Sequence, residues 1–190
     1  IAPSTLYTKS TTAHIAQKAL ESIGCRFFLT PDRQSPQALI RRMSGRVPED
    51  YGALDTFAQE ETRQRMAFAG QRAWYYDEWG GMLQQMRRSD SVIAEFHGLL
   101  KVLDDNLAEY ENDTIARGLD RITEPSLALL ASATVHDLAP YMREGAAWWR
   151  DGFWPRFALI TPGEDEEPSL ASQPQGLDTI PSSLIVPLRD

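Results

Sequence analysis

Apolar residues recur at intervals of three and four positions in several parts of the chain, which is the spacing of one face of an α-helix. This pattern predicts helices over residues 9–23, 36–45, 54–68 and 92–103. Gly24 follows the first helix as a stop signal. Ser35 and Pro36 supply an N-cap and a first helical residue for the second.

Short apolar runs lie between these helices. They predict strands over residues 25–29, 73–76, 127–131 and 157–160. Strands that alternate with helices indicate an α/β domain with a mainly parallel sheet flanked by helices. Ligands of such sheets bind at the carboxyl ends of the strands, so the residues that follow each apolar run are the candidates for chemistry.

Composition places the chain among ordinary soluble proteins. Of its 190 residues 42% are hydrophobic and 24% charged, which suits one globular domain with its own core. The single Cys25 cannot form a disulfide within the chain. No apolar run reaches the roughly 18 residues of a membrane span and no signal peptide is recognisable, so we expect a cytoplasmic protein without membrane contact. Because the chain begins at Ile1 without methionine, we also expect a piece of a longer polypeptide.

Charge is distributed unevenly along the chain. The net charge is −8; residues 160–190 contribute six acids and one base, and five of the 12 prolines stand at or after Pro162. We therefore expect a folded domain over residues 1–162 and an acidic linker or tail over 163–190, exposed and poorly ordered at least over 163–176. Sixteen of the 19 basic residues are arginine, so a local basic channel would be built from guanidinium groups.

The first predicted helix begins with residues suited to binding phosphate. Lys9 could reach the β and γ phosphates of a nucleotide, and the hydroxyl of Ser10 could bind Mg²⁺, as in a phosphate-binding loop. Pro3 and Thr8 stand where the pattern G-x-x-x-x-G-K-S has glycine. The alternative is a capped helix N-terminus with a solvated lysine.

Two acids follow the strand predicted over residues 73–76. In that position Asp77 would hold a Mg²⁺ ion and Glu78 would activate water for hydrolysis. The alternative is that both acids cap the turn that follows. The 68 positions from Lys9 to Asp77 leave room for the two segments to meet in one sheet.

Three later side chains suit the same site. Ser132 and Thr134 follow the third predicted strand and could sense a γ-phosphate, or could satisfy turn amides. Arg156 precedes the last predicted strand and could stabilise charge on a transferred phosphoryl group, or could form a structural ion pair.

Aromatic residues near the end of the domain also have two interpretations. Beside Arg150 they could stack on the bases of single-stranded DNA, or they could pack against the sheet. These residues are Trp148, Trp149, Phe153 and Trp154. The three histidines are too widely separated to form the ligand spacing of a zinc site.

Four blocks carry a family resemblance: Pro3–Thr12, Trp74–Gly81, Pro125–Thr134 and Gly152–Phe157. In this order they resemble the RecA-like ATPase domain of phage-type and plasmid-type primase-helicase proteins. The likeness spans residues 1 to about 162, and its last three blocks are the most specific. It implies a RecA-like P-loop NTPase that binds ATP with Mg²⁺, acts on single-stranded DNA during replication of mobile elements, and forms a homo-oligomer.

The resemblance also implies roles for individual residues. It assigns the nucleotide to Thr8, Lys9, Ser10, Thr11 and Thr134, the metal to Ser10 and Asp77, hydrolysis to Glu78, and a finger or sensor role to Arg156. Two functions follow as hypotheses. One is an ATP-dependent DNA motor, favoured by the retained Lys9, Ser10, Asp77 and Glu78. The other is a scaffold or DNA-docking module without turnover, favoured by the missing glycines.

Overall fold

The computed structural model describes residues 9–115, 118–143 and 145–161, with side chains described from Ala13 onwards. The described α-helices are α1 (Lys9–Ser22), α2 (Pro36–Met43), α3 (Thr56–Ala67), α4 (Trp79–Met86), α5 (Phe96–Asp104), α6 (Val135–Met142) and α7 (Ala147–Arg150). The strands are β1 (Gln71–Tyr76), β2 (Glu109–Thr114), β3 (Gly118–Thr123) and β4 (Ser126–Ala131). Short 3₁₀ helices are η2 (Cys25–Phe28), η3 (Tyr51–Ala53), η4 (Val92–Glu95) and η5 (Trp154–Arg156).

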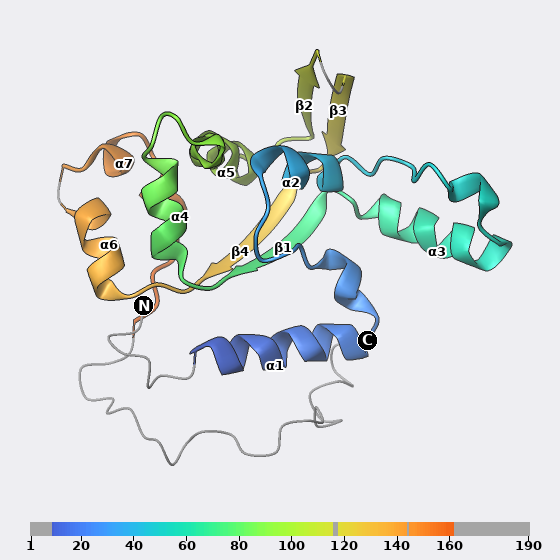
Figure 1. The fold of residues 1–190 in the computed structure, drawn as a ribbon, viewed down its shortest axis with the longest axis horizontal. Coiled ribbons are helices and arrows are strands. Elements are labelled where there is room, and N and C mark those ends of the chain that lie inside the picture. The colour runs from blue at the N-terminus through green and yellow to red at the C-terminus, as the bar shows by residue number, and fades with distance from the viewer. Residues whose placement is uncertain (1–8, 116–117, 144, 162–190) are drawn as a thin grey trace.

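The described strands form two small sheets, so the chain is a mixed α/β protein. β1 and β4 pair in parallel, with Gln71 opposite Ser126 and Tyr76 opposite Ala131. β2 and β3 form an antiparallel hairpin that projects away from the parallel sheet (Figure 1). A single parallel bridge joins Leu29 to the other edge of β1.

Helices cover both faces of the parallel sheet. α1 lies on one face, and α2, α4 and α5 lie on the other (Figure 1). Alternating side chains of β1 meet these two layers, as strand geometry requires. Tyr75 contacts the ring of His14 on α1 at 6.5 Å between centroids, while Trp74 packs against Phe96 of α5 at 5.0 Å.

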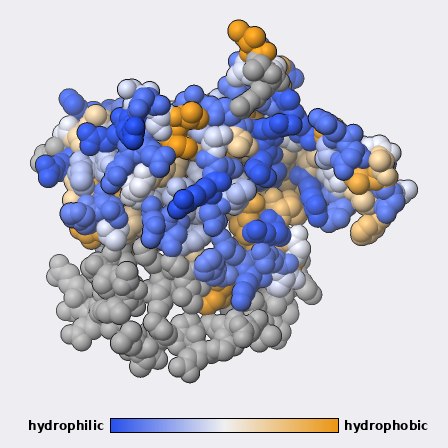
Figure 2. Space-filling model, viewed as in Figure 1, coloured by the Kyte–Doolittle hydropathy of each residue, from blue (hydrophilic) through white to orange (hydrophobic). Residues whose placement is uncertain are grey.

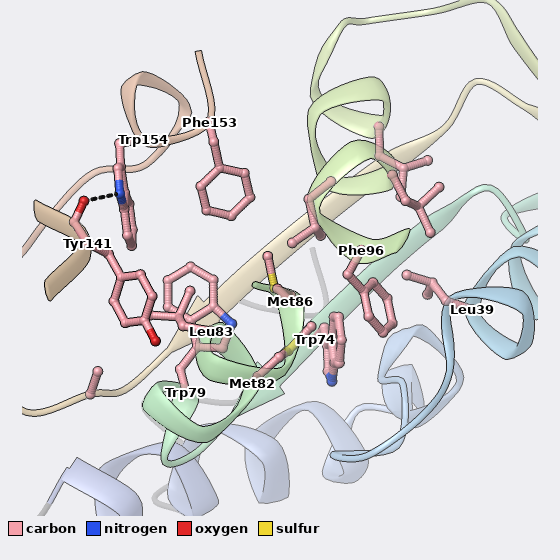
Figure 3. Packing of buried hydrophobic residues seen from close by; sticks show 14 of the residues in the cluster. Leu39, Trp74, Trp79, Met82, Leu83, Met86, Phe96, Tyr141, Phe153 and Trp154 are labelled. Carbon is pink, nitrogen blue, oxygen red and sulfur yellow. Dashed lines mark hydrogen bonds between the residues drawn. The ribbon is translucent and has the colours of Figure 1, made fainter. Parts of the chain in front are cut away.

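The hydrophobic core lies between the sheet and the layer of α2, α4 and α5 (Figure 3). Its most deeply buried large side chains include Leu39, Trp74, Leu83, Phe96 and Phe153, each no more than 1% exposed. Trp148, Phe153 and Trp154, the aromatic group near the end of the described chain, continue this core.

The predicted helices are confirmed. α1 ends before Gly24, whose φ of 79° is the left-handed conformation that glycine adopts without strain. Ser35 caps α2 by accepting a hydrogen bond from the backbone N–H of Ala38 at 3.2 Å. The helix expected over 92–103 divides into η4 and α5, and the one expected over 54–68 is α3.

Two predicted strands are wrong. Residues 25–28 form η2, in which Leu29 N–H bonds back to Arg26, so only Leu29 itself reaches β1. Residues 157–160 form no strand; they follow η5, and the ring of Phe157 contacts that of Trp79 at 5.2 Å between centroids. A short apolar run has too few residues for its periodicity to separate a strand from a tight turn.

The face of the molecule in Figure 2 is largely hydrophilic, and the hydrophobic tip of the β2–β3 hairpin stands out from it. Ile115 at that tip is fully exposed. Among the described residues, the helices are all too short or too polar to cross a membrane. The acidic linker or tail expected over 163–190 lies outside the described residues.

Candidate functional site

The carboxyl ends of β1 and β4 are joined by hydrogen bonds that hold Asp77 in place. Ser132 N–H donates to the carbonyl of Tyr76 at 3.0 Å, and Trp79 N–H donates to the carbonyl of Ser132 at 2.8 Å. The Ser132 hydroxyl also donates to Asp77 Oδ1. The half-buried Asp77 carboxylate is therefore fixed at the point where ligands bind parallel sheets.

Glu78 links β1 to α4 with an unusual backbone. Its φ of 54° and ψ of 47° are left-handed, and its own N–H donates to Asp77 Oδ1 at 3.0 Å. The Glu78 side chain is exposed and makes no capping hydrogen bond to α4, although Glu78 occupies the N-cap position. The alternative that both acids cap the turn therefore holds for Asp77, whose Oδ1 accepts the N–H of Glu78, and fails for Glu78.

Thr134 and Ser132 take different positions after β4. Thr134 is the N-cap of α6 in a capping box: its hydroxyl lies 2.7 Å from Asp137 Oδ2 and accepts from Asp137 N–H at 3.2 Å. Thr134 therefore satisfies a turn amide, which is one of the two alternatives for these hydroxyls. Ser132 instead contacts Asp77 directly.

α1 begins on the side of the sheet where β1 and β4 end (Figure 1). A cavity of about 350 Å³ lies between them, lined by Ala13, Tyr75, Trp79 and Ser132 among others. Lys9, Ser10 and Thr11 form the first turn of α1, but their side chains lie outside the described part, as does Thr8. The expected approach of Lys9 to within roughly 10 Å of the Asp77 carboxylate therefore stays a prediction.

A second cavity, also about 350 Å³, opens on the opposite face of the sheet. It is lined by Asp77 and Glu78 together with Gln34, Tyr76 and Gln85. Both amide atoms of Gln34 are buried here without a hydrogen-bond partner, which is costly unless something else binds them. Sequence reasoning missed Gln34, because the only signal near it was the helix cap that follows.

The side chain of Arg156 is already engaged by acidic and carbonyl groups of the protein itself. Its guanidinium donates to Asp105 Oδ1 at 2.6 Å and to the carbonyl of Gly152 at 2.6 Å, and it lies 3.4 Å from Asp104 Oδ2. The hydrogen bond to Asp105 raises the pKa of Arg156. The arginine thus joins η5 to the end of α5 by the ion pair that was one of its two interpretations.

The aromatic group is mainly packed in the core. Phe153 is fully buried and Trp154 is 1% exposed, with Trp154 Nε1 donating to the carbonyl of Tyr141 at 3.0 Å (Figure 3). Trp148 stacks on Tyr141 at 5.2 Å between ring centroids. Base stacking is therefore closed to Phe153 and Trp154, and Trp149, at 37% exposed, is the most accessible member.

The described residues supply one of the several ligands that a Mg²⁺ ion needs. No group of three or more histidine, cysteine or acidic side chains gathers into a metal cage in the part that the structure describes. Mg²⁺ in nucleotide sites takes one or two carboxylates and completes its shell with phosphate and water. Asp77 satisfies that requirement.

Comparisons of the chain with protein-family models, with curated proteins and with solved structures found no match. Any function must therefore be argued from the site itself.

Proposed function

We propose that the chain is a RecA-like ATPase domain that hydrolyses ATP with Mg²⁺ at the carboxyl ends of β1 and β4 and acts as a DNA motor in the replication of a mobile element. The observation that carries this proposal is that two adjacent acids lie in different environments. Asp77 is anchored by Ser132, whereas Glu78 is exposed and makes no cap. A metal ligand and a general base need these two environments.

The position of α1 supports the same site. α1 begins at the end of the sheet where β1 and β4 end, so the partial positive charge of its N-terminus would face a phosphate bound there (Figure 1). Asp77 lines the cavity on the opposite face of the sheet and not the one beside α1, so the proposal requires a nucleotide that spans the end of the sheet between the two cavities. Lys9 and Ser10 belong to the first turn of α1. In the proposed mechanism Lys9 neutralises the β and γ phosphates, and Ser10 and Asp77 hold the metal.

Glu78 would orient and polarise the attacking water. The left-handed backbone at Glu78 turns the chain sharply between β1 and α4, directly after the metal ligand. Such strain is found where a side chain must be held at a reacting centre. Mg²⁺, when bound, would withdraw charge from the phosphates.

The test is steady-state ATP hydrolysis with and without single-stranded DNA. Glu78→Gln preserves shape and removes the charge, so nucleotide binding should survive while turnover falls at least about tenfold, a barrier change of at least ~1.4 kcal/mol. Asp77→Asn should instead weaken Mg²⁺-dependent nucleotide binding.

Glu124→Gln is the matched control, because Glu124 is also a glutamate with a positive φ, of 47°, but does not line either cavity at the end of β1. It should leave turnover unchanged. Equal turnover by wild type and Glu78→Gln would remove Glu78 from the mechanism. Nucleotide binding without any wild-type turnover would favour the scaffold function that Pro3 and Thr8 suggest.

A further inference from the structure

Arginines gather at the other end of β1, away from the two acids. Arg41, Arg42 and Arg46 line one open cavity of about 500 Å³ at the end of α2. Arg72, the second residue of β1, donates to the carbonyl of Arg42 at 3.2 Å, which places it beside them. Figure 1 shows α2 over this start of β1.

The arginines of this cluster outnumber the acids beside them, of which Glu49 lines the same cavity. Arg46 pairs with Asp120, but Arg41, Arg42 and Arg72 form no ion pair with any carboxylate that the structure describes. Arg72 is held by backbone carbonyls instead, those of Phe68, Gln71 and Arg42. Burial, and then the neighbouring charge of Arg42, lower the pKa of Arg72. The fold thus keeps like charges together at a cost that a bound anion would relieve.

The form of the cluster indicates a polymeric anion. Arg41 and Arg42 are exposed, and a single exposed ion pair contributes little affinity. Several such contacts along one phosphate backbone add together, because each releases a counterion. Guanidinium groups also match phosphate geometry better than ammonium groups do.

We propose that Arg41, Arg42 and Arg72 form a binding surface for the phosphate backbone of single-stranded DNA. The choice of DNA among polyanions rests on the proposed function; the surface itself rests on the arginines. Arg72 and Asp77 are five positions apart along β1 and its end, so the two sites lie roughly 17 Å apart. DNA binding and ATP hydrolysis can therefore be lost separately.

The experiment measures anisotropy of a labelled oligothymidylate of about 20 nucleotides without ATP, at several salt concentrations. The double variant Arg41→Gln/Arg42→Gln should bind at least tenfold more weakly than wild type near 0.1 M salt. Its slope of log affinity against log salt should be shallower by about 1.4, or 0.7 for each lost contact. Arg72 is left intact, because losing its three backbone hydrogen bonds could unfold the chain.

Arg63→Gln/Arg65→Gln is the matched control. It removes the same charge from α3, where Arg63 and Arg65 pair with Glu60 and Glu61. Its affinity should stay within about twofold of wild type. Equal losses of oligonucleotide affinity in the two double variants would overturn the proposed binding surface. So would the absence of binding by wild type.

Two competing anions test which class of negatively charged ligand the surface binds. Inorganic phosphate at millimolar concentration should not displace the oligonucleotide, whereas a small-anion pocket would be blocked by it. Oligoglutamate of equal charge should compete poorly; equal competition would point to an acidic protein partner and overturn the choice of DNA. ATP turnover without DNA should be unchanged in both double variants, so a failed DNA site and a failed ATPase remain distinguishable.

Discussion

At the scale of single residues, Glu78 combines an unfavourable backbone with an exposed carboxylate. A non-glycine residue in the left-handed region costs about 1–2 kcal/mol, and Glu78 makes no cap that would offset it. Asn106 and Glu124 share a positive φ, of 51° and 47°. Only Glu78 among these lies beside Asp77, so its strain coincides with the candidate site.

Glycine at position 78 should therefore stabilise the fold and abolish the proposed activity. Relief of the left-handed strain is partly offset by roughly 0.5–1 kcal/mol of added freedom in the unfolded chain, so Glu78→Gly should raise the free energy of unfolding by about 0.5–1 kcal/mol. Urea titration measures this gain. Glu124→Gly should give a similar gain with full turnover. A gain in stability with unchanged turnover at position 78 would contradict a catalytic role.

At the scale of elements, the second and third residues of α4 are glycines in different surroundings. A Cβ on Gly80 would lie 2.5 Å from Cβ of Asp137 on α6, whereas a Cβ on Gly81 would meet nothing within 4 Å. Asp137 also completes the capping box of α6. The close contact of α4 with α6 thus requires glycine at one of the two positions only.

Alanine substitutions should separate the pair. Gly80→Ala must displace Asp137 and should cost about 1–3 kcal/mol of unfolding free energy. Gly81→Ala should be neutral or stabilise by about 0.5 kcal/mol, because alanine favours the helix. Thermal unfolding of the two variants side by side measures the contrast. A stable Gly80→Ala protein would show that α6 can move away from α4 freely.

The elements that sequence predicted best are those with a cap or a long apolar period. Ser35 with Pro36 located the start of α2, and the apolar run before Asp77 located β1. The hairpin of β2 and β3 escaped prediction, because Glu109–Thr114 is almost wholly polar and turns only Tyr110 toward Ile122. Polar strands of this kind carry no apolar alternation to detect.

The sequence predicts only those residues of the candidate site that directly follow an apolar strand. Position after an apolar strand was enough to single out Asp77, Glu78 and Ser132, because strand ends meet at one edge of a parallel sheet. Gln34 could not be found this way, since its importance lies in buried amide atoms without partners. The ion pairs of Arg156 join segments about 51 positions apart in sequence, and no local pattern encodes them.

At the scale of the whole molecule, an aromatic group ties the end of the described chain to α5. The ring of His97 on α5 packs against Trp148 at 5.0 Å and against Phe153 at 4.9 Å between centroids, and those two rings also contact each other at 5.0 Å. Its Nε2 lies 3.0 Å from Asp151, which Lys101 also approaches at 3.4 Å. Burial is the largest influence and lowers the pKa of His97; Asp151 opposes this and Lys101 reinforces it.

The stability of the molecule should therefore fall as pH is lowered through this histidine's range. The unfolded chain takes up a proton near pH 6.5, whereas the folded chain does so only at lower pH. Between these values the unfolded state binds more protons, so each unit of pH costs at most about 1.4 kcal/mol. His97→Phe keeps a ring in contact with Trp148 and Phe153 and cannot titrate, so its unfolding free energy should fall less than that of wild type between pH 7.5 and pH 5.5. Replacing the exposed His136 by phenylalanine controls for the loss of one histidine. Equal losses of unfolding free energy in wild type and His97→Phe would show that the aromatic group tolerates a charged imidazole.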